Sequence, residues 1–250
     1  MRIECRAGGY SFLKGISPYS AGVVAAPGFE IEHVRLERPL PLERGFQEIE
    51  SYLVSQHRRR QALCGVELRS PRPFTFQGFQ DFNQRYVGIL NRWGILLDGL
   101  NPVARTNVAP EVAPPAEPSL YGFSITLPSD GPPSFVVAGA GELPEGSLDP
   151  HDVVRRGEVS VDALREKVRF VMERMSSRLT GLGVTWAQVT ATQIYTVHDI
   201  HPFLAAEVLG PMREAAHTGV NWHYARPPIE SIEYEMDVRG CHREGILANG

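Results

Sequence analysis

The sequence has few cysteines, no long apolar run and no excess of positive charge. Cys5, Cys64 and Cys241 are the three cysteines in 250 residues, and they are scattered and odd in number. Such a set does not indicate a disulfide framework, and it is typical of a reducing compartment. No two of them have the spacing of a zinc site. We therefore expect a cytoplasmic protein.

The composition excludes several classes of partner. No apolar run approaches the roughly 20 residues of a membrane-spanning helix, and the first residues lack the apolar core of a signal peptide. The chain carries a net charge of −4, with 42% hydrophobic and 22% charged residues, as in an ordinary globular protein. Without bulk positive charge it has little to attract nucleic acid or an anionic membrane. We expect neither as a partner.

One pair of histidines is close enough in sequence to be considered as metal ligands. His198 and His201 lie close in sequence, but they straddle the expected start of a helix, with Asp199 as its cap and Pro202 in its first turn. Zinc needs further ligands, and the neighbouring sequence does not supply them. We therefore expect no metal and no cofactor.

Hydrophobic periodicity predicts the helices. Apolar residues recur at helical spacing over 42–53, 79–93 and 161–179. Ser160 can cap the third helix, and Gly181 and Gly183 can end it. A fourth helix is expected from Asp199 to Pro211. Short β-branched or alternating runs predict strands at 2–6, 10–13, 22–26, 29–36, 62–68, 102–110, 119–127, 134–141, 189–197, 219–228 and 231–238.

The order of these elements repeats. Strand, helix, strand, helix, strand, strand occurs on both sides of a Gly-Pro-Pro segment at 131–133. We therefore predict two homologous α+β domains, residues 1–130 and 131–250. In each, two helices cover one face of a mostly antiparallel sheet.

Two strands carry residues that suggest a site. Arg105 lies near the start of the strand at 102–110, and a planar, always charged guanidinium suits a carboxylate or phosphate ligand. A surface salt bridge is the alternative. In the strand at 231–238, Glu233, Glu235 and Asp237 alternate with apolar residues. This acidic face is either part of a site or a solvated strand surface.

In sequence, these segments resemble the reactive-intermediate deaminase (Rid, or YjgF) family, and the likeness covers nearly the whole chain. Rid members are small α+β domains of chorismate-mutase-like fold that assemble as trimers with ligand sites between subunits. The resemblance therefore implies a homotrimer with sites at domain or subunit interfaces. The segments that carry it are Ser11-Phe12-Leu13-Lys14-Gly15, Pro102-Val103-Ala104-Arg105-Thr106-Asn107-Val108 (similar to the "PARxxV" signature), Phe135-Val136-Val137-Ala138-Gly139, the helix at 161–179, Thr192-Gln193-Ile194-Tyr195-Thr196-Val197-His198-Asp199 with Phe203, and Ala225-Arg226-Pro227-Pro228 leading to Glu233-Tyr234-Glu235.

The family's two functional positions are divided between the halves. The signature arginine, which binds the substrate carboxylate, falls on Arg105 in the first half and on Gly219 in the second. The glutamate that positions water falls on Ser124 and on Glu235. Each half has lost one of the two. This suggests a composite site, with Arg105 facing Glu235 across an interface. Drift in a non-catalytic pseudo-domain is the alternative.

Such a site could hydrolyse an enamine or imine acid. Arg105 would fix the carboxylate, and Glu235 would act as acid and base, its pKa raised by Glu233 and Asp237. The resemblance favours a 2-aminomuconate-type deaminase in aromatic compound degradation, acting on a small carboxylate. A chorismatase-like hydrolase and a non-catalytic small-acid-binding trimer are the alternatives. Further substrate-binding candidates are Tyr19, Asn107, Tyr195 and His223, with Arg226 for a second carboxylate.

Overall fold

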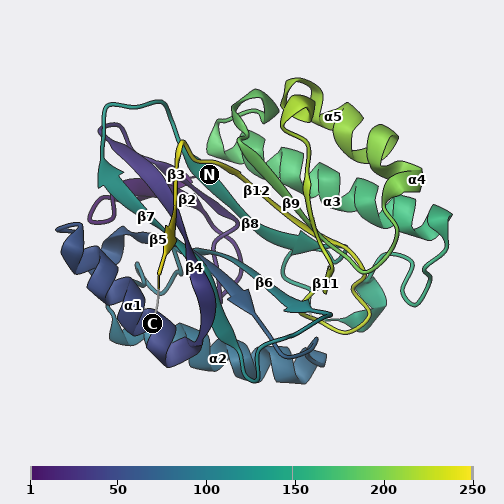
Figure 1. Cartoon of the computed structure of the whole chain (residues 1–250), viewed down its shortest axis with the longest axis horizontal. Coiled ribbons are helices and arrows are strands. Elements are labelled where there is room, and N and C mark those ends of the chain that lie inside the picture. The colour runs from purple at the N-terminus through teal and green to yellow at the C-terminus, as the bar shows by residue number, and fades with distance from the viewer. Residues whose placement is uncertain (1, 148, 249–250) are drawn as a thin grey trace.

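A computed structural model describes residues 2–147 and 149–248. Two β-sheets form the middle of the molecule, and helices cover their outer faces (Figure 1). The seven-stranded sheet has the order β1 (Arg2–Cys5), β2 (Tyr10–Leu13), β3 (Gly22–Ala25), β8 (Phe135–Gly141), β12 (Glu235–Gly240), β9 (Ala191–Tyr195), β10 (Asn221–His223). The six-stranded sheet has the order β11 (Ala225–Arg226), β6 (Ala104–Pro110), β5 (Leu63–Arg69), β7 (Ser119–Pro128), β4 (Phe29–Pro41), β13 (Arg243–Leu247).

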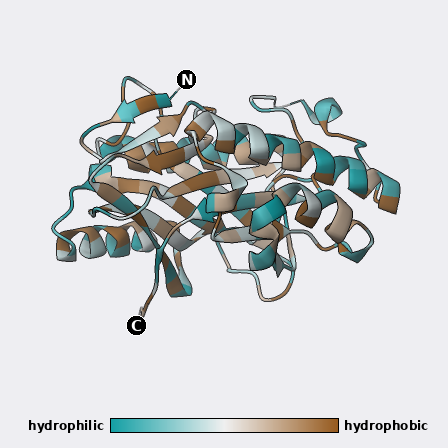
Figure 2. Ribbon diagram, turned by 90° about the horizontal axis from the view of Figure 1, so that it is seen from above, coloured by the Kyte–Doolittle hydropathy of each residue, from teal (hydrophilic) through white to brown (hydrophobic). Residues whose placement is uncertain are grey.

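Each sheet packs its own helices through an apolar face. Helices α1 (Leu42–Ser55) and α2 (Phe76–Arg92) share a core with β4, β5 and β7, and helix α3 (Val161–Leu182) shares one with β8, β9 and β12. A third apolar cluster joins residues of both sheets, among them Phe12, Cys64 and Ala138. Viewed from above, apolar positions run along the strands between the helical layers (Figure 2). The predicted α+β class is confirmed.

The long helices begin and end close to where the sequence predicts. The Ser160 hydroxyl accepts a hydrogen bond from the amide of Ala163 at 3.3 Å, and Gly183 ends α3 in the left-handed conformation, with φ of 75°. Gly181 lies inside this helix. Single 3₁₀ turns occur at Arg60–Ala62, Pro150–Asp152 and Trp186–Gln188. Over residues 2–147 and 149–248, none of the helices combines the length and the apolar character that a membrane span requires.

The predicted stop at Pro211 is wrong. The chain stays helical through α4 (His201–Phe203), a π-helical segment (Leu204–Leu209), α5 (Gly210–Met212) and a 3₁₀ segment (Arg213–Thr218). Pro211 lies in the first turn of α5, where a helix does not need the amide hydrogen that proline lacks.

The repeat predicted from sequence is visible in the strand order. The run β6-β5-β7-β4 in one sheet matches the run β10-β9-β12-β8 in the other. In both runs the first pair is parallel, and the other two pairs are antiparallel. Both halves of the chain therefore use the same strand topology.

Sheet membership does not follow the predicted boundary between residues 130 and 131, which stays a prediction. Strands β1 to β3 extend the seven-stranded sheet, because β3 pairs with β8. The strand expected at 219–228 is divided between the sheets, with β10 paired to β9 and β11 paired to β6. The C-terminal β13, which the sequence pattern did not predict, pairs in parallel with β4. The two halves are thus joined by shared strands.

Candidate active site

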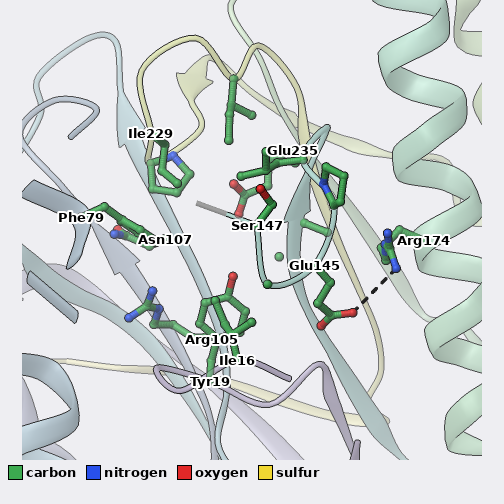
Figure 3. Close-up of a pocket in the computed structure, with 18 of the residues that line it drawn as sticks. Ile16, Tyr19, Phe79, Arg105, Asn107, Glu145, Ser147, Arg174, Ile229 and Glu235 are labelled. Atoms are coloured by element: carbon green, nitrogen blue, oxygen red, sulfur yellow. Dashed lines mark ion pairs between the residues drawn. The ribbon is translucent and has the colours of Figure 1, made fainter. Parts of the chain in front are cut away.

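A cavity with about 690 Å³ of atom-free space, counting the part open to solvent, lies where the two sheets meet α3. It brings together four of the residues predicted from sequence: Tyr19, Arg105, Asn107 and Glu235 (Figure 3). Arg105 and Asn107 come from β6 of the six-stranded sheet, whereas Glu235 comes from β12 of the seven-stranded sheet. The two sheets of a single chain therefore both contribute to this cavity.

Arg105 is a buried cation with an incomplete set of partners. The residue is 3% exposed, and its Nη1 atom has no hydrogen-bond partner among the described residues. The guanidinium carbon lies 4.8 Å from the ring centre of Tyr19 and 4.9 Å from that of Tyr86. Phe79 and Phe82 lie within 6 Å of the same atom. Burial lowers the pKa of Arg105, but an arginine side chain stays charged. Such a buried, desolvated guanidinium favours binding of an anion.

Glu235 is a buried carboxyl that favours its protonated form. It begins β12, and burial raises its pKa well above the usual range, with the neighbouring Asp237 adding to the shift. Arg105 and Arg178 oppose this shift only in part. The neighbouring strand β8 leaves room for the carboxyl because residue 139 is a glycine. A Cβ added at Gly139 would lie 2.2 Å from Glu235 Oε1. A carboxyl of this kind can donate a proton and then accept one.

The acidic face of this strand is buried rather than solvated, and its members differ in role. Glu233 precedes β12, and its carboxylate lies 2.8 Å from His198 Nε2, an interaction that lowers its pKa. Besides burial, the largest causes that raise the pKa of Glu235 are Asp237 and Glu142, and a part for Glu233 stays a prediction. Asp237 accepts a hydrogen bond from the Tyr195 hydroxyl at 2.9 Å. Burial, and then repulsion from Glu67, raise the pKa of Asp237 to about 7.

Three predicted residues lie outside the lining of the cavity. The ring of Tyr195 stacks on His223 with centres 4.9 Å apart, and His223 Nε2 lies 2.8 Å from the Gln193 side-chain oxygen. Burial, and then the charge of Arg69, lower the pKa of His223 to about 4. Arg226 lies on β11, where its Nε donates to Glu111 at 2.7 Å. Their roles in substrate binding stay predictions.

Sequence reasoning missed a second group of residues that line the cavity. Arg174 and Arg178 lie one turn apart on α3, and Glu145 lies on the loop that follows β8. Arginines at positions i and i+4 share one face of a helix, and this spacing was the available signal. Gly139 belongs to a segment that carries the Rid resemblance, but its role in making room for Glu235 depends on the three-dimensional structure.

Within residues 2–147 and 149–248, no cluster of three or more His, Cys, Asp or Glu side chains could hold a metal ion. His198 pairs with Glu233, and His201 pairs with Asp199 at 2.6 Å. The residues of the cavity that carry charge are arginines and carboxyls, which suit an organic acid.

Comparison with known proteins identifies the family. The model of the family described as 2-aminomuconate deaminase CnbZ matches residues 2–245. A 2-amino-5-chloromuconate deaminase from Comamonas testosteroni is 47% identical over 244 residues, which cover 96% of each chain. A crystal structure of a chorismatase is 11% identical with a TM-score of 0.48, covering 96% of this chain and 79% of that one. A YjgF/YER057c/UK114-family protein from Mycobacterium tuberculosis is 21% identical with a TM-score of 0.27, covering 43% of this chain and 78% of that one. The chain thus belongs to the 2-aminomuconate deaminase family.

Proposed function

We propose that this chain hydrolyses the enamine or imine form of a 2-aminomuconate-type dicarboxylate to a 2-oxo or 2-hydroxy acid and ammonia. One observation carries the proposal: the buried Arg105 and the buried Glu235, whose pKa burial raises, line the same cavity. Membership of the family supports it and favours it over a chorismatase-like hydrolase or a non-catalytic binder of small acids.

Arg105 would bind the carboxylate next to the reacting carbon. Its free Nη1 can donate to that carboxylate, and charge-assisted hydrogen bonds to a fixed guanidinium orient the substrate strongly. The surrounding aromatic rings exclude water from the cation. The substrate carboxylate would thus supply the partner that the buried guanidinium lacks.

Glu235 would move the protons. The enamine first shifts a proton from nitrogen to carbon and becomes an imine. Glu235 then protonates the imine nitrogen while a water oxygen bonds to C2, and the carboxylate takes back a proton from that water. In the collapse, Glu235 protonates the amine, the C2–N bond breaks with its electron pair on nitrogen, and the hydroxyl proton returns to the carboxylate. One water is consumed, one ammonia leaves, and Glu235 ends protonated as it began.

Tyr19 and Asn107 would orient the substrate. Burial raises the pKa of Tyr19, so its hydroxyl stays neutral and can donate a hydrogen bond. The side-chain oxygen of Asn107 accepts from the Ser70 hydroxyl at 3.0 Å, which directs the amide nitrogen away from Ser70. That buried nitrogen has no partner among the described residues, so it is available to an acceptor on the substrate.

A turnover assay tests the proposal. Ammonia release and ultraviolet absorbance are followed with 2-aminomuconate for the wild type, Arg105→Met and Glu235→Gln. Loss of an acid–base group lowers turnover by about 10²- to 10⁴-fold, and we expect Glu235→Gln to fall in this range. Glu233→Gln is the matched control, because Glu233 lies outside the cavity lining and pairs with His198. A wild type without turnover, or full activity in both site variants, would contradict the proposal.

We further propose, from the Rid resemblance, a cytoplasmic homotrimer of two-domain chains that acts in aromatic compound degradation. Trp222 in the edge strand β10 and Tyr224 directly after it support an assembly, because they are 39% and 55% exposed. Light scattering with size-exclusion chromatography measures the mass. A monomer at micromolar concentration would contradict the trimer.

A further inference from the structure

We propose that Arg174 and Arg178 bind the second carboxylate of the dicarboxylate substrate, and that Glu145 occupies their subsite until the substrate displaces it. This inference rests on the proposed function, because it assigns the substrate's other end within the same cavity. It gives the chain a means to select dicarboxylates over monocarboxylates.

Arg178 is held rigidly at the wall of the cavity. Its Nη1 donates to the carbonyl of Ala138 at 2.8 Å, and its side chain is 6% exposed. Its Nη2 donates to Glu145 Oε1 at 3.2 Å, while its buried Nε has no hydrogen-bond partner among the described residues. The guanidinium is therefore fixed in place with one donor still unsatisfied. An incoming carboxylate could satisfy that donor.

Glu145 bridges the two arginines as a substrate carboxylate would. Its second oxygen lies 3.8 Å from Arg174 Nη1. Figure 3 shows this ion pair on the opposite side of the cavity from Arg105. Glu145 and Arg174 are both 28% exposed, and a partly exposed ion pair of this kind contributes little to stability. The contact with Arg178 is more buried, but a second carboxylate would accept the same hydrogen bond there. It can therefore replace the carboxylate of Glu145 at low cost.

The charges around the cavity match a doubly charged ligand. Arg105, Arg174 and Arg178 carry three positive charges, and Glu145 carries one negative charge. Burial raises the pKa of Glu235, which disfavours a second negative charge in the cavity. The remaining two positive charges balance the two carboxylates of a muconate-type acid. A monocarboxylate would leave one of them unbalanced.

Arg226 was the sequence-based candidate for this role, and its surroundings argue against it. It already forms an ion pair with Glu111, and it is not among the residues that line the cavity. Its side chain is 41% exposed, whereas that of Arg178 is 6% exposed. Solvent screening weakens binding to an exposed cation.

Comparing two substrates separates this role from a structural one. KM and kcat are measured with 2-aminomuconate and with the monocarboxylate 2-aminoacrylate generated in the assay. Removing a charged hydrogen-bond donor weakens binding by about 10- to 100-fold. We therefore expect Arg174→Met to raise KM for 2-aminomuconate by that factor, with little change in kcat or with the monocarboxylate. Glu145→Gln should lower KM for 2-aminomuconate, because the competing charge is gone.

Matched variants make the outcome decisive. Arg169→Met is the control, because Arg169 lies on the same helix but pairs with Glu207 and does not line the cavity. Arg178→Lys keeps the positive charge but loses the planar guanidinium with its paired donors. If this variant of a buried residue fails to fold, Arg174→Met tests the subsite instead. Equal losses with both substrates, or a KM rise in Arg226→Met but not in Arg174→Met, would overturn the inference. A loss of kcat in Glu145→Gln with both substrates would make Glu145 catalytic and also overturn it.

Binding tests the subsite even if the proposed function fails. A wild type that turns over neither substrate would refute the deaminase proposal alone. Calorimetry would then compare adipate, a saturated dicarboxylate, with hexanoate. Tighter binding of adipate that is lost in Arg174→Met supports the subsite, and equal binding of the two acids refutes it.

Discussion

Gly139→Ala should reduce turnover far more than stability. Gly139 lies in β8, and a Cβ there would stand 2.2 Å from Glu235 Oε1, where ordinary contact begins at about 3.4 Å. The carboxyl must therefore move by roughly 1 Å, and a misplacement of that size costs about 10²-fold in rate. We expect kcat to fall by about that factor.

The stability cost is small because the displaced atom is the end of a flexible side chain. Overpacking typically costs about 1–3 kcal/mol, and replacing glycine by alanine regains about 0.4–1 kcal/mol by restricting the unfolded chain. Gly139 is not in the left-handed region, so alanine fits its backbone conformation. We expect the free energy of unfolding to fall by about 2 kcal/mol or less.

Urea unfolding and steady-state ammonia release measure the two effects separately. Gly245→Ala is the control, because Gly245 is also a strand glycine and a Cβ there meets no atom within 4 Å. Wild-type kcat in a folded Gly139→Ala protein would show that the position of the Glu235 carboxyl does not matter for turnover.

Three further predictions concern stability. The pKa of Asp237 is raised to about 7 in the folded protein, so the folded state holds this proton more tightly than the unfolded chain does. The contribution of Asp237 to the free energy of unfolding should therefore be lost as pH rises from about 4 to 7. In Asp237→Asn the free energy of unfolding should depend less on pH over that range. An unchanged dependence on pH would contradict this. Lys167→Met should cost about 3–5 kcal/mol by leaving Glu142 buried without its cation, and adding Glu142→Gln should recover part of it. If Lys167→Met unfolds at the wild-type urea midpoint, that ion pair is not needed. Ser160→Ala should cost about 1 kcal/mol in thermal or urea unfolding through loss of the α3 cap, and no change would exclude a capping role.

The helices were predictable because the spacing of their apolar residues shows which face of each helix is buried. Leu42, Phe46, Ile49 and Leu53 all lie buried in α1, as their spacing predicts. Strand partners were less predictable, because alternation shows which face is buried but not which strand lies alongside. The residues of β1 to β3 therefore did not show that these strands belong to the seven-stranded sheet.

The candidate site was predictable in part, from the chemistry of single residues and from the family resemblance. Arg105 and Glu235 stood out as charged residues on predicted strands and through the complementary loss in the two halves, and both line the cavity. Tyr19 also lines it, although it lies outside the segments that carry the resemblance. Tyr195 and His223 instead belong to a separate buried cluster with Asp237 and Gln193. Arg178 escaped notice because its importance comes from burial against the Ala138 carbonyl, and helical spacing alone does not show such a contact.

Binding of the reaction product to Arg105→Met and Glu235→Gln separates the roles of the two residues. We propose that Arg105 binds the carboxylate and that Glu235 moves the protons. Calorimetry with the 2-oxo dicarboxylate should therefore show near wild-type affinity for Glu235→Gln, despite its slow turnover, and affinity weakened by about 10-fold or more for Arg105→Met. Undiminished affinity in Arg105→Met would contradict the division of roles between the two sheets.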